Sequence, residues 1–181
     1  MAGIDEARPG QEGGRMNPIH LNDVTNLLHL EAHYLDTQQW DPWLNLFLEE
    51  AEYWVPAWKS EHETTSNPKA ELSLIYYATR AGLEDRVWRV RSGRSVASKP
   101  LPRTQHNVNN VMLGNETVTD GVQVLCNWTV HQFRTKPQEV EVLFGRCEYD
   151  IVQHVNGLRI QRKKVILLND YLPAMLDFYS L

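Results

Sequence analysis

Two histidines and a glutamate near residue 30 have types and a spacing that suit metal or acid–base chemistry. His29 and His33 are four residues apart, which places both imidazoles on one face of a helix, where they can hold a metal ion. Glu31 lies on the opposite, apolar face of that helix, so a zinc-protease order is absent. An exposed or interfacial histidine pair is the simpler interpretation, and an iron site of two histidines and one carboxylate stays open.

Glu31 is the residue best suited to acid–base work. A carboxylate on an apolar stripe must be either paired or protonated. If the chain folds into an open cone around this helix, Glu31 could act there as an acid or base, together with Tyr34 or His106. Alternatively, it could form a buried ion pair with an arginine such as Arg86 or Arg103. We favour the ion pair, because most buried pairs of this kind are structural.

The two cysteines do not have the pattern of an iron–sulfur site. A Rieske centre needs two cysteines and two histidines in two close pairs, and no histidine adjoins Cys126 or Cys147. We interpret both as reduced, small apolar residues of strands. The sequence also lacks a glycine-rich phosphate loop and a Gly-x-Ser-x-Gly motif. We therefore expect no catalytic, cofactor-binding or metal-binding residue in this chain.

Composition narrows the class of protein further. The chain has 181 residues, enough for one core, and a formal net charge of −5, which disfavours a nucleic-acid partner. No apolar run approaches the roughly 20 residues that span a membrane, and the first residues lack a signal pattern, so we expect the cytoplasm. Six Trp and seven Tyr indicate either an aromatic-rich core or aromatic subunit contacts.

A local basic cluster follows the middle of the chain. Arg86, Arg89, Arg91 and Arg94 lie within one predicted helix and the residues just after it. They could dock onto an acidic partner, or they could form a solvated face with local salt bridges. Asp85 lies four residues before Arg89, a spacing that favours such a bridge.

The elements that position these residues divide into helices first and long strands later. Residues 1–18 form a tail rich in Gly and Pro, and residues 19–181 form a single domain. Helical periodicity predicts helices over residues 21–37, 41–49 and 83–91, with Asn22 or Asp23 capping the first, Asp41 capping the second, and Pro42 at its first position. Short strands are predicted at residues 53–55 and 72–77, and longer ones from residue 103 onward, including 122–130, 140–154 and 158–169.

Two local signals shape the last two strands. Asn156-Gly157 predicts a two-residue hairpin with positive φ at both positions, which sets Val155 opposite Leu158 and Asp150 opposite Lys163. Near Gly145 the apolar residues change face, which predicts a bulge or a strong bend there. The order of elements is α+β, with a bent, mainly antiparallel sheet wrapped around the early helices as a half-open cone.

Several separate motifs resemble the small, or beta, subunits of bacterial aromatic-ring-hydroxylating dioxygenases, and the benzoate/anthranilate/halobenzoate branch in particular. The similarity covers residues 20–181 in order. It departs from the family in a longer N-terminal tail and in Asn109, where the family often has Ser. The matching segments are His33-Tyr34-Leu35-Asp36, Trp43-Leu44-Asn45-Leu46-Phe47, residues 53–58, residues 74–77 with Arg80 and residues 82–87, residues 102–111, and residues 173–179.

The resemblance implies a fold of the nuclear-transport-factor-2 and scytalone-dehydratase type. It also implies a non-catalytic subunit that trimerises within an α3β3 hexamer and scaffolds the large oxygenase subunits. The large subunit would carry a Rieske [2Fe–2S] cluster and a mononuclear Fe(II). The whole enzyme would cis-dihydroxylate an aromatic carboxylate with O2 and with electrons from NADH through a reductase. No catalytic residue of the family maps onto this chain.

Two other classes of function remain possible on the same fold. A stand-alone dehydratase or isomerase would need an acid–base set inside the cone around Glu31. A free-standing ligand-binding module would need a dry, closed pocket. Fold alone does not decide between them, because function depends on the site.

Overall fold

The computed structural model describes residues 18–93, 100–170 and 176–181 of the chain. The predicted tail falls almost wholly outside these ranges, so the division at residue 18 stays a prediction. The described elements are, in order, α1 (Leu21–Asp36), α2 (Trp40–Leu44), β1 (Phe47–Pro56), β2 (Ser73–Tyr77), α3 (Ala81–Arg91), β3 (Arg103–Leu113), β4 (Gly121–Arg134), β5 (Glu139–His154), β6 (Gly157–Leu167) and the short 3-10 helix η2 (Phe178–Ser180).

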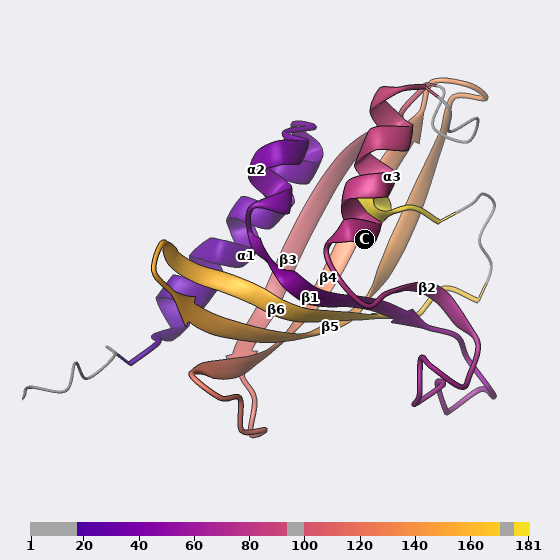
Figure 1. The fold of residues 1–181 in the computed structure, drawn as a ribbon. Helices are drawn as coiled ribbons and strands as arrows, with labels where there is room; N and C mark the ends of the chain where they lie inside the picture. Colours follow the sequence, from indigo (N-terminus) through magenta and orange to yellow (C-terminus); the bar gives the residue numbers. More distant parts are fainter. Residues whose placement is uncertain (1–17, 94–99, 171–175) are drawn as a thin grey trace, which may run out of the picture.

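The strands form one six-stranded sheet in the order β2-β1-β6-β5-β4-β3. All neighbours are antiparallel except β1 and β6, which run parallel. In Figure 1, β1, β5 and β6 pass beneath the helices, while β3 and β4 rise behind them. The sheet therefore curves around the three helices and stays open between its edge strands β2 and β3, as the predicted half-open cone requires. None of the helices in the described ranges has the length and apolar character needed to cross a bilayer.

Helix α1 matches its predicted range closely. Its buried side is the predicted stripe, and His29 and His33 are exposed on the other side. The helix begins one residue before the expected cap, with His20 as N-cap. Asp23 takes part in the capping from the third helical position, where its carboxylate accepts a hydrogen bond from the His20 backbone N–H at 3.4 Å.

The second helix is shorter than predicted. It ends at Leu44, and the apolar residues after it enter strand β1, which begins at Phe47 and not at Tyr53. A short apolar run such as this one fits either a helix or a strand when the sequence is considered alone. Phe47 pairs with Ile160 of β6, so these residues belong to the sheet. The N-cap is Gln39 rather than Asp41, because Trp40 is already helical.

The last hairpin has a different register from the predicted one. His154 pairs with Gly157 and Gln153 with Leu158, so Val155 and Asn156 form the turn. Of Val155, Asn156 and Gly157, only Gly157 has positive φ, at 94°, a conformation that glycine adopts without strain. This register would pair Asp150 with Gln161, but a bulge shifts the strands by one residue and Asp150 pairs with Arg162, so the predicted pairing of Asp150 with Lys163 is wrong.

Near Gly145 the sequence predicts a bulge or a strong bend; the bulge is absent there, and one lies on the neighbouring strand instead. Pairing of β5 with β4 and β6 continues without a shift through Gly145, although a Cβ there would lie 2.0 Å from the carbonyl oxygen of Ile166. Ile151 pairs with Ile160 and Asp150 with Arg162, which leaves Gln161 of β6 without a partner in β5. This bulge exchanges the two faces of β6.

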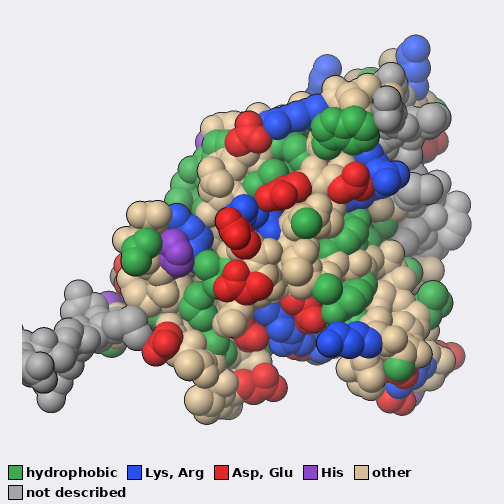
Figure 2. Space-filling model, in the orientation of Figure 1, with side chains coloured by type: hydrophobic (Ala, Val, Ile, Leu, Met, Phe, Trp, Pro, Cys, Tyr) green, Lys and Arg blue, Asp and Glu red, His purple; other side chains and the backbone are tan. Residues whose placement is uncertain are grey.

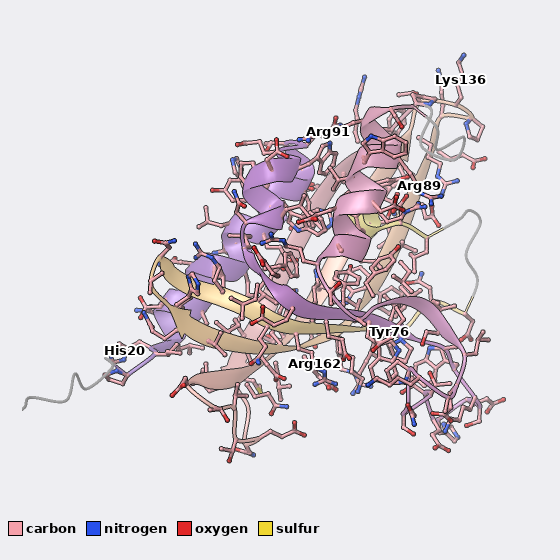
Figure 3. All side chains as sticks on the ribbon, in the orientation of Figure 1. His20, Tyr76, Arg89, Arg91, Lys136 and Arg162 are labelled. Atoms are coloured by element: carbon pink, nitrogen blue, oxygen red, sulfur yellow. The ribbon has the colours of Figure 1, made fainter. Side chains whose placement is uncertain are left out.

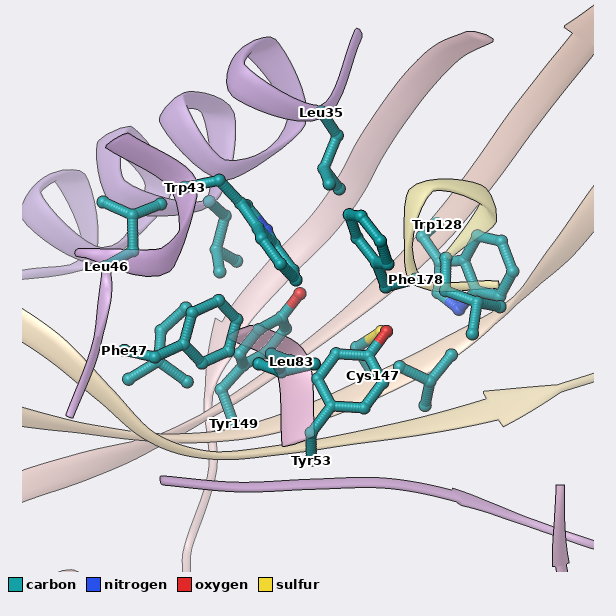
Figure 4. Close-up of a cluster of buried hydrophobic side chains, with 14 of the residues drawn as sticks. Leu35, Trp43, Leu46, Phe47, Tyr53, Leu83, Trp128, Cys147, Tyr149 and Phe178 are labelled. Carbon is teal, nitrogen blue, oxygen red and sulfur yellow. The ribbon is translucent and has the colours of Figure 1, made fainter. Parts of the chain in front are cut away.

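The core fills the space between the helices and the concave face of the sheet. The Phe178 ring stacks on Trp43 with centroids 4.8 Å apart and meets Trp40 edge-on at 5.3 Å. Figure 4 shows this cluster with Trp43 and Phe178 facing each other above Tyr53 and Tyr149. Four of the six Trp are buried, which favours the aromatic-rich core, although Trp88 on α3 is half exposed. Residues 176–181 thus close the cone with the chain's own side chains.

Candidate functional site

Glu31 lies at the centre of the cone and is paired, as predicted, but with a different partner. Its Oε1 accepts a hydrogen bond from Lys163 Nζ at 2.8 Å, and its Oε2 accepts one from the Tyr149 hydroxyl at 2.9 Å. Glu31 and Lys163 are 3% and 2% exposed, so the ion pair is shielded from bulk solvent. The expected arginine partners are engaged elsewhere: Arg86 pairs with Asp177, and Arg103 lies over the Phe133 ring.

The bulge at Gln161 explains why the lysine was missed. Ile160, just before the bulge, faces the core. In an unbroken strand the next even-numbered residues, Arg162 and Lys164, would face the core as well. The extra residue reverses this, so Lys163 points inward and Arg162 outward. A bulge at Gln161 has no strong sequence signal, since no glycine or proline marks it.

The chemistry of the pair is that of a fixed charge. Burial lowers the pKa of Lys163, but interactions with Glu31 above all, and with Tyr53 and Cys147, outweigh burial and hold that pKa above its ordinary value. Burial raises the pKa of the Tyr149 hydroxyl, and the neighbouring charge of Glu31 raises it further. Lys163 therefore stays cationic and Tyr149 stays protonated at neutral pH, which suits a structural network better than proton transfer.

A second polar pair joins the end of α1 to β3. His106 Nδ1 lies 2.6 Å from Asp36 Oδ1, and Asp36 also accepts hydrogen bonds from the His106 backbone N–H and the Thr104 hydroxyl, both at 2.9 Å. Burial raises the pKa of the Asp36 carboxyl, but the hydrogen bonds and charge of His106 together with Thr104 lower it below its ordinary value. The opposite ring nitrogen of His106, Nε2, is buried and has no hydrogen-bond partner.

The two polar pairs meet at one small cavity. Glu31, His106, Tyr149 and Lys163 all line it, and its volume is about 20 Å³. An aromatic or sugar-sized substrate needs hundreds of cubic ångströms, so the acid–base set has no room for one. Tyr34, the other expected member of that set, does not line the cavity; its ring lies 5.9 Å from that of His33. The cavity around Glu31 therefore has no room for the substrate of a stand-alone dehydratase or isomerase.

Charged side chains cover the helices and one half of the outer sheet face. On the helix side, acidic and basic residues are interspersed (Figure 2). Below them, Tyr76 and Arg162, labelled in Figure 3, both contact Glu52 of β1, at 3.2 Å and 3.3 Å. Lys164 pairs with Glu148 at 3.1 Å. Here the outer face of β1, β2 and β6 has the paired charges of a solvated surface.

The outer face of β3, β4 and the start of β5 is different. Residues 104–113 and 121–133 contain no Asp, Glu, Lys or Arg. We define the outer patch as six neighbouring residues on this face, in the cross-strand pairs Phe133 with Val140, His131 with Val142, and Thr129 with Phe144. Three of them are exposed apolar side chains: Val140 at 66%, Val142 at 41% and Phe144 at 44%. Loss of charge together with exposed apolar and aromatic residues is the composition of a protein–protein interface.

Curated relatives match nearly the whole chain. The benzoate 1,2-dioxygenase subunit beta of Acinetobacter baylyi is 38% identical over 168 residues, which cover 92% of this chain and 96% of the relative. The anthranilate 1,2-dioxygenase small subunit of the same organism is 39% identical, covering 86% and 94%. The family model "Ring hydroxylating beta subunit" matches residues 30–174. The chain belongs to this family.

Solved structures agree with the fold of this beta subunit. The beta subunit of benzoate 1,2-dioxygenase from Burkholderia mallei superposes with a TM-score of 0.75 at 36% identity, covering 92% of this chain and all of that one. A putative scytalone dehydratase from Novosphingobium aromaticivorans has a TM-score of 0.62 at 13% identity over 87% and 92% of the chains, which shows the shared fold alone. The predicted α+β cone of the scytalone-dehydratase type is confirmed.

The remaining candidate residues of the beta subunit, its two cysteines and the arginines of the basic cluster, make structural contacts. Cys126 and Cys147 are buried, unbridged and directly opposite each other on β4 and β5. Across the described ranges, no group of three or more His, Cys, Asp or Glu is arranged to hold a metal ion. In the basic cluster, Arg89 forms the predicted pair with Asp85 at 2.8 Å and Arg91 bonds Asp41 at 2.8 Å, so local salt bridges account for both; Arg94 lies outside the described residues.

Proposed function

We propose that this beta subunit is the structural, non-catalytic component of a dioxygenase that cis-dihydroxylates an aromatic carboxylate. The names of its relatives support this substrate class, since they include benzoate, anthranilate, toluate and 2-halobenzoate 1,2-dioxygenases at 38–40% identity. The small cavity at Glu31 supports a role without chemistry in this chain, because no aromatic ring fits there.

In this proposal a large oxygenase subunit carries the metal centres. A Rieske [2Fe–2S] cluster and a mononuclear Fe(II) would lie on that chain, and NADH would supply electrons through a reductase in the cytoplasm. The described residues of the beta subunit do not fit either centre, because they offer no cluster of metal ligands. The beta subunits would form a trimer and hold three large subunits in an α3β3 hexamer.

The outer patch is the observation that carries the assembly role. A sheet face left in water usually alternates apolar and charged residues, whereas β3 and β4 are uncharged between Arg103 and Arg134. In addition, β3 is a long edge strand without the lysines or glutamates that normally protect such an edge. We propose that the outer patch forms the contact between beta subunits in the trimer.

The test is to express the beta subunit alone and with its large subunit, and to measure mass by light scattering and iron by elemental analysis. The unsubstituted chain should give a trimer alone and a larger, iron-containing complex with its partner. Phe144→Glu should give a monomer, because it would bury a charge in the apolar contact. Val155→Glu is the matched control, since Val155 is 91% exposed at a hairpin tip, and it should assemble normally.

Two results would contradict the proposal. A Phe144→Glu chain that still forms trimers would remove the outer patch from the contact. A large subunit that keeps its oligomeric state and full activity without the beta subunit would remove the scaffolding role altogether.

A further inference from the structure

The cavity beside Glu31 has the size and the lining of a site for one very small polar molecule. Its walls come from α1, β3, β4, β5 and β6, closed by Leu181, and its volume is about 20 Å³. A single water molecule needs at least roughly 10–15 Å³ of such space, and purely apolar cavities of this size stay dry. Here the walls include an imidazole, an ammonium, a carboxylate and a phenol, so the polar requirement for hydration is met.

His106 supplies a buried nitrogen atom that lacks a hydrogen-bond partner. Its side chain is 6% exposed, and its Nδ1 is committed to Asp36 at 2.6 Å. Because the Asp36 carboxylate only accepts hydrogen bonds, Nδ1 carries a proton, and Nε2 is an acceptor whenever it carries none. Nε2 has no hydrogen-bond partner in the described structure, and buried polar atoms in native proteins rarely stay unpaired.

Lys163 supplies a donor on the same cavity. An ammonium has three N–H donors, and two of them are directed to Glu31 Oε1 at 2.8 Å and to the Leu181 carbonyl oxygen at 3.3 Å. The ammonium also lies 5.5 Å from the Tyr53 ring centroid and 5.6 Å from that of Tyr149, but its third donor has no oxygen or nitrogen acceptor in the described structure. Trp128 also lines the cavity, and its buried indole N–H has no hydrogen-bond partner in the described structure. One acceptor, Nε2, and at least one donor, the third N–H of Lys163, thus border a space of the size of one molecule that can both donate and accept.

We propose that this cavity is a binding site for one water molecule, which donates a hydrogen bond to His106 Nε2 and accepts one from Lys163. The water joins the two polar pairs into one network that runs from Asp36 through His106, Lys163 and Glu31 to Tyr149. Asp36 and Glu31 both belong to α1, so the network fastens that helix to β3, β5 and β6. The site is independent of the proposed subunit role and holds or fails without it.

Ala32 allows a test that leaves every polar atom of the network in place. Its side chain lines the cavity from α1. Ala32→Val would fill the space with carbon and displace the water, leaving Nε2 unpaired, whereas Ala32→Ser would offer a hydroxyl in its place. Ser and Val have similar helix propensities, so that effect cancels in the comparison.

Chemical denaturation of both full-length variants should show the Ser variant to be more stable. We expect the folding equilibrium constant of Ala32→Val to be about tenfold lower than that of Ala32→Ser, as an orphaned buried acceptor would cause. Equal stability, or a more stable Val variant, would mean a dry cavity that gains from being filled, and would overturn the proposal.

A high-resolution crystal structure of the unsubstituted chain decides the matter directly, even if neither variant folds. The expected result is one solvent peak in the cavity within hydrogen-bonding distance of both His106 Nε2 and Lys163 Nζ. An NMR spectrum of the imidazole should independently show the proton on Nδ1. A cavity without density, or a proton on Nε2 at neutral pH, would refute the assignment.

Discussion

The Glu31–Lys163 pair shows how one buried residue can be mistaken for a catalytic one. Glu31 has the burial and the position in the cone of an acid–base residue, but each of its carboxylate oxygens already accepts a hydrogen bond. Burying two such charges costs free energy, and the ion pair stabilises the fold mainly when both partners are present. The pair therefore fixes the arrangement of α1 on the sheet.

Removing one partner should lower the free energy of unfolding much more than removing the whole network. Lys163→Met leaves Glu31 as an uncompensated buried charge, so we expect a loss of about 3–5 kcal/mol in the free energy of unfolding. The triple variant Glu31→Leu, Tyr149→Phe, Lys163→Met should recover most of that loss, because apolar groups of similar size replace the polar ones. Urea denaturation measures both. A triple variant as unstable as Lys163→Met would show that the network contributes more than its charge balance.

Asp36 should make the free energy of unfolding depend on pH. Its pKa is lower in the folded chain than the ordinary value of 3.8, so the unfolded chain takes up the proton first on acidification. The stabilising effect is complete above pH 3.8 and is lost as pH falls through the folded-state pKa. Asp36→Asn should thus cost about 2 kcal/mol at neutral pH, and this difference should shrink below pH 3.8.

Asp41 provides the matched control for that titration. Its pKa is also lowered, by the hydrogen bond from Arg91, but the pair is exposed to solvent and should contribute little. Denaturation of both asparagine variants at a series of pH values compares them. An equal cost for the two substitutions would show that burial of the Asp36–His106 pair adds nothing.

At the scale of elements, the sequence predicts which segments are helices and strands better than it predicts how strands align. The periodicity of Leu27, Leu28 and Leu35 defines α1, and the alternation from Val122 to Val130 defines β4. These are properties of one segment alone. Pairing depends on a partner far along the chain, so neither the start of β1 at Phe47 nor the bulge at Gln161 could be read from local residues.

The candidate site follows the same division. The stripe on α1 predicts that Glu31 is buried, and elementary electrostatics predicts that it is paired. The identity of the partner depends on the bulge in β6, which turns Lys163 inward, and so it could not be predicted. Asp36 and His106 come together because β3 packs along α1, a contact between elements that no motif announces.

Two glycines should respond to alanine for different reasons. Gly157 has a φ of 94° with open space around it, so Gly157→Ala should cost about 1 kcal/mol through backbone strain alone. Gly145 has an ordinary backbone, but a Cβ would lie 2.0 Å from the Ile166 carbonyl oxygen, so Gly145→Ala should cost about 3 kcal/mol. Thermal denaturation ranks them, and the opposite ranking would contradict the described packing of β5 on β6.

At the scale of the whole molecule, assembly should be visible in stability. If the outer patch is covered in a trimer, dissociation precedes or accompanies unfolding, and the melting temperature rises with protein concentration by mass action. Phe144→Glu should abolish this concentration dependence, and Val155→Glu should preserve it. Calorimetry at several concentrations measures the effect. A melting temperature that is independent of concentration in the unsubstituted chain would argue for a stable monomer.

The parallel contact between β1 and β6 has a consequence for how the chain is made. β1 lies in the first third of the polypeptide, yet its partner β6 is the last of the described strands to leave the ribosome. Until then the middle of the sheet is missing, so β1 and β2 cannot join the part of the sheet that β3, β4 and β5 form. A nascent chain stalled before residue 157 therefore exposes apolar side chains and unpaired strand edges, so its synthesis depends on speed or on chaperones that shield it until the final strand arrives.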